Sequence, residues 1–313
     1  MTIYDLLIIG AGPAGIEAAL QAAARGLSYL LIDKFDAGSL IEQTMNNKKF
    51  YQIYGRNVDL LKGTLAFPDR AKGYELVALW KQQVAPLAFH KNESLKTITR
   101  SGQEPFVVTT TKDQYQARYV LLTSGTFEHH KTLQVDGEHG NPKVHYTLDY
   151  YQDYRDQAVV VVGGGNTALE TAIYFGDANK VTLLVRRDRF TESATEANQM
   201  AIRELVQKGT LHVVYHAAVM QITPQEIAVQ TGQGPLTLPY DLLFVHIGFE
   251  KPTDFLASLG LQVRNGEPVY NEKFESNIPG LYIAGALTGS DSIVECANQT
   301  YQVVHQLPNS PGI

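Results

Sequence analysis

Residues 4–15 read YDLLIIGAGPAG, a short apolar run that ends in three glycines with the spacing G-x-G-x-x-G. The run is typical of a buried parallel strand, and residues 14–25 after it are rich in helix formers. A second apolar run over 27–32 ends at Asp33. Strand, glycine turn, helix and strand in this order are typical of a dinucleotide-binding unit, in which the turn and the helix N-terminus bind a pyrophosphate.

Asp33 follows the last motif glycine by roughly twenty residues, the distance at which a carboxylate binds a ribose hydroxyl in this motif. A polar strand end that faces solvent is the alternative interpretation. The residues predicted to contact the first nucleotide are Gly10, Gly12, Pro13, Ala14, Gly15, Asp33 and Lys34.

The same order of elements occurs again over residues 158–187, with a G-x-G-x-x-A turn after a buried strand. This copy ends in Arg186 and Arg187 instead of a carboxylate, and guanidinium groups bind phosphate oxygens as bidentate donors. The alternative interpretation is that these arginines form a solvated basic edge, and it applies more to Arg189 than to Arg186 and Arg187. The residues predicted to contact the second nucleotide are Gly163, Gly165, Asn166, Thr167, Ala168, Arg186 and Arg187.

Each copy is followed by a series of strands and a closing glycine, Gly125 in the first half and Gly248 in the second. The expected strands are 95–99, 106–111, 115–122, 211–215, 219–222, 226–230 and 236–247. A further strand ends at Gly285, and a closing helix is expected over 291–307. The sequence therefore predicts an α/β protein with two dinucleotide-binding Rossmann-like domains, each carrying a β-meander.

The composition excludes several classes of protein. At 313 residues, with 44% hydrophobic and 19% charged residues, the chain is long and apolar enough for two folded domains. A net charge of −6 argues against a nucleic-acid binder, and no apolar run reaches the ~18 residues of a membrane span. Because the chain starts without a basic leader, a cytoplasmic protein is expected. A single cysteine, Cys296, excludes an internal disulfide and a cysteine-based zinc site, and no metal is expected.

The two fingerprints, the closing glycines and the C-terminal strand and helix resemble the low-molecular-weight thioredoxin reductase family over essentially the whole chain. The resemblance implies a discontinuous FAD-binding domain, 1–125 with 249–313, and an inserted NADPH-binding domain, 126–248. It also implies a homodimer. Residues 186–190, RRDRF, look like the family's motif for the 2′-phosphate of NADPH. The other cofactor contacts that it implies are Tyr54, Gly125, Gly248, Gly285 and Ala286.

Three departures separate the chain from that family. The family's redox Cys-x-x-Cys pair precedes the second fingerprint, where residues 144–149 here read VHYTLD. Relatives that reduce bacillithiol disulfide carry a cysteine at the position of Ala14, and the family's aspartate for the ribitol of FAD is Ala286 here. The chain therefore looks closest to the thioredoxin-reductase-like ferredoxin or flavodoxin NADP reductases and to the flavodoxin–quinone reductases.

The resemblance implies an FAD-dependent oxidoreductase that takes electrons from NADPH and passes them through the flavin to ferredoxin or flavodoxin. A quinone or a low-molecular-weight disulfide is the alternative acceptor. An alternative of another class is a non-catalytic nucleotide-binding redox sensor or partner-binding protein, which the missing dithiol and Ala286 favour. No side chain is assigned a catalytic role, because the flavin carries the chemistry.

Three other features have two interpretations each. Cys296 lies within the expected closing helix, where a lone cysteine is more often a small buried hydrophobe than a reactive thiol. The pair His129 and His130 is interpreted as a solvated hinge rather than a metal site. His246 is interpreted as a satisfied core or interdomain histidine rather than a catalytic one.

The segment after the first βαβ unit also has two interpretations. Tyr54 either stacks on the flavin or packs within its own loop. Residues 41–72 carry six basic residues against three acidic ones, although the whole chain is acidic. This local excess of positive charge either docks an acidic electron carrier or belongs to an ordinary surface.

Overall fold

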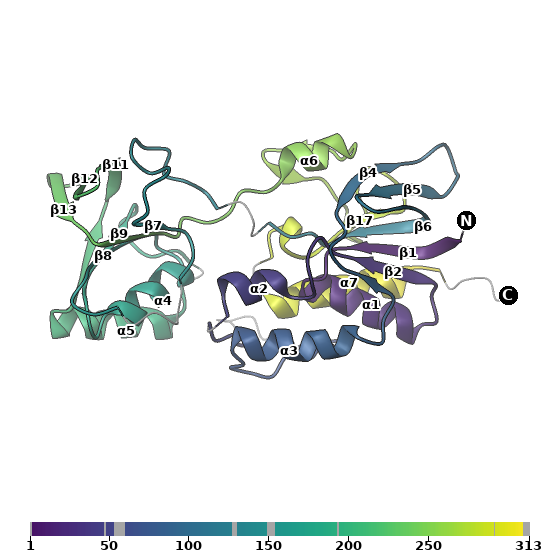
Figure 1. Cartoon of the computed structure of the whole chain (residues 1–313), viewed down its shortest axis with the longest axis horizontal. Helices are drawn as coiled ribbons and strands as arrows, with labels where there is room; N and C mark the ends of the chain where they lie inside the picture. The colour runs from purple at the N-terminus through teal and green to yellow at the C-terminus, as the bar shows by residue number, and fades with distance from the viewer. Residues whose placement is uncertain are drawn as a thin grey trace. The chain divides into compact units, whose positions relative to one another are not determined.

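The computed structural model describes residues 2–46, 48–52, 60–126, 130–148, 154–192, 194–290 and 292–308. The chain divides into two compact units (Figure 1). Unit 1 comprises Met1–His129 with Lys251–Ile313, and unit 2 comprises His130–Glu250. The second unit is therefore inserted into the first along the sequence.

Unit 1 is built on a sheet of seven strands in the order β3-β2-β1-β6-β5-β4, with β17 paired to β6. Its parallel strands are β1 (Ile3–Ile9), β2 (Tyr29–Ile32), β3 (Phe89–His90), β6 (Gln114–Leu122) and β17 (Leu281–Ile283). The strands β4 (Leu95–Thr99) and β5 (Phe106–Thr110) complete an antiparallel meander on β6. The central strands β1 and β2 are mostly apolar, as expected for strands covered on both faces.

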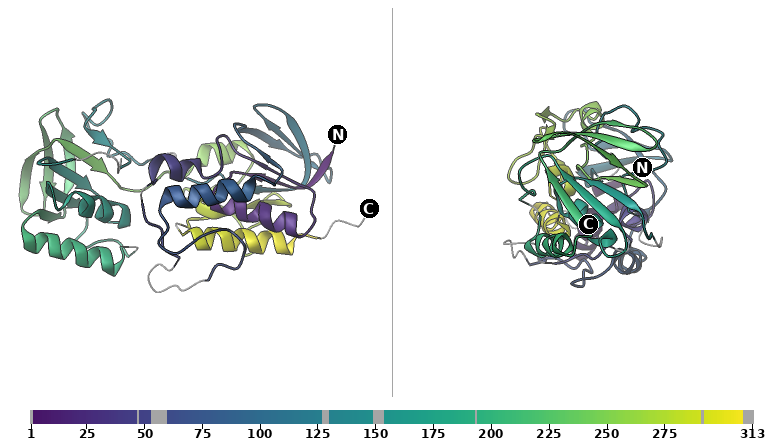
Figure 2. Two further views of the ribbon diagram at one scale, coloured as in Figure 1. Left: turned by 60° about the horizontal axis from the view of Figure 1, so that its bottom comes forward. Right: turned by 90° about the vertical axis from the view of Figure 1, so that its left-hand side faces the viewer.

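Three helices, α1 (Pro13–Ala24), α3 (Gly73–Val84) and α7 (Ile293–Gln306), lie side by side on one face of this sheet (Figure 2). Small residues on α1, including Ala18 and Ala22, are fully buried and allow α7 to pack closely. The core on this face also contains Ile8 and Trp80, both 0% exposed. The other face is covered by the meander and by α6 (Thr253–Ser258). The short elements of this unit are α2 (Ser39–Thr44), β15 (Val263–Arg264), β16 (Glu267–Pro268) and the 3₁₀ helix η1 (Gly285–Thr288).

Unit 2 has three layers. Its central sheet is parallel, in the order β10-β9-β8-β14-β7. These strands are β7 (Val144–His145), β8 (Ala158–Val162), β9 (Lys180–Val185), β10 (Leu211–Tyr215) and β14 (Leu242–Val245). Helices α4 (Asn166–Phe175) and α5 (Glu196–Lys208) cover one face. An antiparallel sheet of β11 (Ala218–Ile222), β12 (Glu226–Thr231) and β13 (Gly234–Pro239) covers the other.

The predicted fold class is confirmed: both units are Rossmann-like, with a parallel sheet, covering helices and an antiparallel meander. One strand prediction was wrong. The run 236–247 is split into β13 and β14, which belong to different sheets. Pro239 ends β13 because it has no N–H to donate. The chain then returns to the parallel sheet at Asp241, whose carboxylate accepts the Ala158 N–H at 2.8 Å.

Candidate nucleotide-binding sites

The first fingerprint joins β1 to α1 through a turn that only glycine fits. Gly10 has φ of +109°, and a Cβ there would lie 2.5 Å from the Thr123 carbonyl oxygen. A Cβ on Gly15 would lie 1.7 Å from the Gly10 carbonyl oxygen. These two glycines therefore let α1 start directly against the carboxyl end of β1 and its neighbour β6.

The N-terminus of α1 is open in the way that a phosphate site requires. Gly12 is the N-cap, no side chain caps the helix, and its first turn holds no acidic residue. A Cβ built on Gly12 meets no other described atom within 4 Å. Pro13 takes the first helical position, where its missing N–H is not needed. The backbone donors of this turn and the positive end of the helix dipole are thus available to a pyrophosphate.

Asp33 has a structural role beside the predicted ribose contact. Its Oδ2 accepts the Ala11 N–H at 2.6 Å, and its Oδ1 accepts the Phe35 N–H at 2.7 Å. These bonds tie the end of β2 to the fingerprint turn. A carboxylate oxygen can accept more than one hydrogen bond, so these two bonds do not by themselves exclude the predicted ribose contact. Lys34, next to it, is exposed, and its Nζ lies 5.2 Å from the centre of the Phe35 ring.

The closing strand β17 brings Gly285 and Ala286 to the same edge of unit 1. A Cβ on Gly285, which has φ of +76°, would lie 3.0 Å from the Ala14 Cβ. The Gly285 N–H is held by Gln299 Oε1 of α7 at 2.8 Å, and Thr288 Oγ1 lies 3.0 Å from the same oxygen. Gln299 was not predicted, because a polar residue on an amphipathic helix carries no signal of this role.

Three further residues of unit 1 were predicted to contact the cofactor: Gly125, Ala286 and Tyr54. Gly125 follows β6, has φ of +74°, and a Cβ there would meet no other described atom within 4 Å. Ala286 is half-buried within η1. Tyr54 lies outside the described residues, so its role stays a prediction.

The second fingerprint has the same geometry between β8 and α4. Gly163 has φ of +145°, and a Cβ there would lie 2.2 Å from the His246 carbonyl oxygen and 2.9 Å from the Ala168 Cβ. Gly165 is the N-cap of α4, again without a side-chain cap. Asn166 Oδ1 accepts the Thr195 N–H at 2.9 Å, which fixes the start of α5 beside the turn. Thr167 follows and is exposed.

Arg186 and Arg187 follow β9 directly, at the carboxyl edge of the parallel sheet. Both side chains are exposed, and neither forms an ion pair with any residue in the described part of the chain. The Arg187 carbonyl accepts the His216 N–H at 3.1 Å, which fixes this edge against the end of β10. Gly248, with φ of +99°, lies beyond the end of β14, and its carbonyl accepts the Lys131 N–H at 3.0 Å. Two cations at a Rossmann strand end are suited to a nucleotide phosphate.

The structure describes the surroundings of His246, Cys296 and His130. His246 Nε2 lies 3.0 Å from Thr171 Oγ1, which confirms a satisfied histidine. Cys296 is 6% exposed within α7, which confirms a buried position. His130 begins unit 2, as expected for a residue between the domains, but it is half-buried rather than solvated. Its ring centre lies 5.7 Å from that of Tyr146 and 4.8 Å from that of Phe249, and burial lowers its pKa. His129 lies outside the described residues.

The segment that replaces the redox dithiol contains β7 and no sulfur. The His145 ring stacks on Phe244 with centres 5.2 Å apart, and its Nε2 is buried without a hydrogen-bond partner among the described residues. Burial lowers the pKa of His145, so the ring is neutral at neutral pH. Tyr146 donates its hydroxyl to Glu138 Oε1 at 2.8 Å, and burial raises the pKa of this tyrosine. These contacts are structural and provide no redox group.

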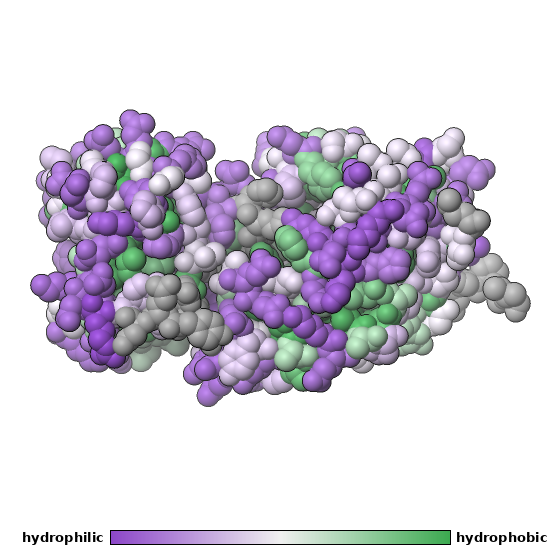
Figure 3. Space-filling model, viewed as in Figure 1, coloured by the Kyte–Doolittle hydropathy of each residue, from purple (hydrophilic) through white to green (hydrophobic). Residues whose placement is uncertain are grey.

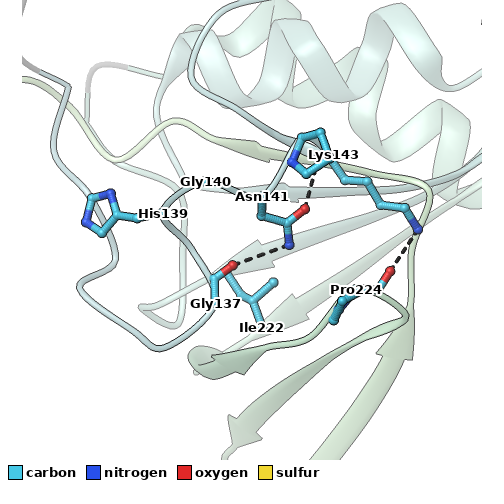
Figure 4. Close-up of a pocket in the computed structure, with 8 residues that line it drawn as sticks. Gly137, His139, Gly140, Asn141, Lys143, Ile222 and Pro224 are labelled. Atoms are coloured by element: carbon cyan, nitrogen blue, oxygen red, sulfur yellow. Dashed lines mark hydrogen bonds between the residues drawn. The ribbon is translucent and has the colours of Figure 1, made fainter.

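A cavity of about 270 Å³ lies elsewhere in unit 2, at the amino ends of β7 and β14 (Figure 4). Two of the polar side chains that line it, Asn141 and Lys143, already have partners within the protein. Asn141 Nδ2 donates to the Tyr240 hydroxyl at 2.8 Å, and Lys143 Nζ donates to the Pro224 carbonyl at 2.9 Å. Because the fingerprint turns lie at the carboxyl ends of the strands, this cavity is not part of the nucleotide site.

No described helix has both the length and the apolar character needed to cross a membrane. No cluster of three or more histidine, cysteine, aspartate or glutamate side chains suited to a metal ion occurs in the described ranges.

The chain is similar in sequence and in fold to known reductases. A family model described as pyridine nucleotide-disulphide oxidoreductase matches residues 7–285. The bacilliredoxin reductase Bdr of Bacillus subtilis is 27% identical over 301 residues, covering 92% of this chain and 91% of that protein. A ferredoxin–NADP reductase of Streptococcus suis is 29% identical over 306 residues, covering 90% and 85%. The thioredoxin reductase of T. acidophilum aligns with a TM-score of 0.79 at 25% identity over 98% of each chain.

The fold and the two fingerprints thus define a two-domain flavoprotein of the thioredoxin reductase type. The chain belongs to the pyridine nucleotide-disulphide oxidoreductase family. It is an NADPH-dependent oxidoreductase whose cofactors are FAD and NADPH.

Proposed function

We propose that the protein carries electrons from NADPH through FAD to ferredoxin or flavodoxin in the cytoplasm, without a protein thiol. The observation that supports this most strongly is the absence of a dithiol: β7 and the residues after it, up to 148, contain no cysteine, and Cys296 is buried in α7. Relatives named ferredoxin–NADP reductase support the same acceptor.

The two units then have different nucleotides. Unit 1 holds FAD, with the pyrophosphate at the N-terminus of α1 and a ribose at Asp33, and its open turn at Gly12 fits such a ligand. Unit 2 holds NADPH, with the 2′-phosphate at Arg186 and Arg187. When bound, FAD would supply the redox chemistry between NADPH and the acceptor. The side chains bind and orient the two nucleotides; none is required as an acid, base or nucleophile.

A low-molecular-weight disulfide is the second candidate acceptor, because one relative is named a bacilliredoxin reductase. A similar solved structure is the bacillithiol disulfide reductase of Staphylococcus aureus, which aligns with a TM-score of 0.84 at 25% identity over 97% of this chain and 98% of that one. Ala14 weighs against this acceptor, because the resemblance implies a cysteine at this position in relatives that reduce bacillithiol disulfide. A homodimer is proposed from the family resemblance alone, and light scattering on the purified protein tests it.

The acceptor is tested by anaerobic turnover with NADPH and four acceptors: ferredoxin, flavodoxin, menadione and bacillithiol disulfide. We expect both protein carriers to be reduced and the disulfide to be left intact. Reduction of the disulfide together with failure to reduce either carrier would overturn the proposal.

A further inference from the structure

A short two-stranded ribbon at the start of α3 gathers lysines from two parts of the chain. Lys49 and Lys72 form an antiparallel bridge, the Gly73 N–H donates to the Lys48 carbonyl at 3.0 Å, and the Phe50 N–H donates to the Ala71 carbonyl at 2.8 Å. We call Lys48, Lys49 and Lys72, with the neighbouring Tyr51 and Tyr74, the basic ribbon. Figure 3 shows that the visible face of unit 1 is largely hydrophilic, with smaller apolar areas.

The acidic groups near the ribbon already accept hydrogen bonds from other groups of unit 1. Both Glu42 oxygens accept from Lys81 Nζ at 2.8 Å, and Glu75 Oε2 accepts the Lys72 N–H at 2.7 Å. Lys49 and Lys72 form no side-chain ion pair with any residue of the described ranges. The ribbon is therefore a local excess of positive charge on a chain whose net charge is −6.

The lysine side chain at position 72 is unfavourable for the start of α3, although Glu75 caps the backbone N–H of this residue. It is the N-cap of α3, where serine, threonine, aspartate or asparagine is favoured, and it places a cation at the positive end of the helix dipole. Local rules of this kind are broken most often at functional sites. The lysine at this N-cap therefore points to a role in binding.

The ribbon also presents aromatic surface. Tyr51 is 38% exposed and Tyr74 is 44% exposed, and Lys72 Nζ lies 5.7 Å from the centre of the Tyr74 ring. Exposed tyrosines beside cations are typical anchors of protein interfaces.

We propose that the basic ribbon docks an acidic electron-carrier protein, a deduction that rests on the proposed function. The ribbon belongs to the unit assigned to FAD and follows α2, whose N-cap Gly38 donates its N–H to the Ala11 carbonyl of the first fingerprint at 3.0 Å. Charge complementarity at this surface speeds association with an acidic carrier and fixes its orientation.

The test compares the double variant Lys49→Glu/Lys72→Glu with the control Lys96→Glu. Lys96 is an exposed lysine on β4 of the same unit and forms no ion pair among the described residues. Binding of ferredoxin and of flavodoxin to the FAD-loaded protein is measured by calorimetry at low and high salt. We expect the double variant to bind about ten- to a hundredfold more weakly at low salt, and the control to match the wild type. High salt should remove most of the difference, because it screens exposed charges.

A second variant, Lys72→Ser, separates docking from folding. Serine is a better N-cap than lysine, so this variant should have a higher melting temperature than the wild type while it binds the carrier more weakly. A double variant that binds as tightly as Lys96→Glu would overturn the docking surface even if the wild type reduces the carriers. A wild type that neither binds nor reduces either carrier would overturn the proposed function and the docking surface together.

Discussion

Replacing Asp33 by alanine removes a carboxylate that has two roles, and the two roles are separable by experiment. In the absence of FAD, the variant loses the bonds from the Ala11 and Phe35 amides, which measure 2.6 and 2.7 Å. A hydrogen bond to a charged group contributes about 1.5–3 kcal/mol, and Asp33 is only half-buried, so the lower end applies to each bond. We therefore expect the apoprotein to lose about 3 kcal/mol of its free energy of unfolding. Asp33→Asn should lose about half of that, because its amide group must face one of the two N–H donors.

The same substitution also removes the predicted ribose contact. Losing one charge-assisted bond of about 1.5–3 kcal/mol weakens binding by about one to two decades, so the Kd for FAD should rise by about ten- to a hundredfold. Urea unfolding of the apoprotein measures the first effect, and quenching of flavin fluorescence measures the second. Asp113→Ala is the control, because Asp113 lies in the turn between β5 and β6 and should leave FAD affinity unchanged. An unchanged Kd in Asp33→Ala would refute the ribose role, and unchanged apoprotein stability would refute the structural role.

Three further predictions test other parts of the molecule. Arg187→Ala should lower kcat/KM for NADPH about ten- to a hundredfold and leave NADH nearly unchanged; equal use of both nucleotides by the wild type would contradict the phosphate site. Cys296→Ala should keep carrier reduction within about tenfold, and a larger loss in a folded, FAD-loaded variant would restore a thiol mechanism. Burial raises the pKa of Glu17, so the native state keeps a proton that the unfolded chain has lost. The free energy of unfolding should therefore fall as the pH rises above 4.5, and urea titrations should show a smaller fall in Glu17→Gln.

The nucleotide-binding turns could be predicted from the sequence because their signal is local. Gly10, Gly15 and Gly163 are required by contacts with backbone atoms a few ångströms away, and any chain with this strand–turn–helix path needs glycine there. The arginines after β9 were predicted for the same reason, since the spacing places them at the carboxyl end of the strand. The structural role of Asp33 was missed because its partner, the Ala11 amide, carries no sequence signal.

Other features depend on contacts that no local pattern encodes. Glu17, an acidic residue within α1, is 0% exposed and accepts the Thr64 and Leu65 N–H groups at 3.0 and 2.7 Å. A carboxylate at such a position is normally solvated, and its partners lie far along the chain. The break after Pro239 was also missed, because the apolar alternation continues on both sides of it and the change of sheet depends on tertiary pairing.

We expect a yellow protein, or a colourless one that becomes yellow when FAD is added, because the open N-terminus of α1 and Asp33 compensate for the missing ribitol contact at Ala286. Anaerobic NADPH should then bleach the flavin absorbance, and NADH should do so far more slowly. A folded protein that fails to bind added FAD, or whose bound FAD is not bleached by NADPH, would contradict the account.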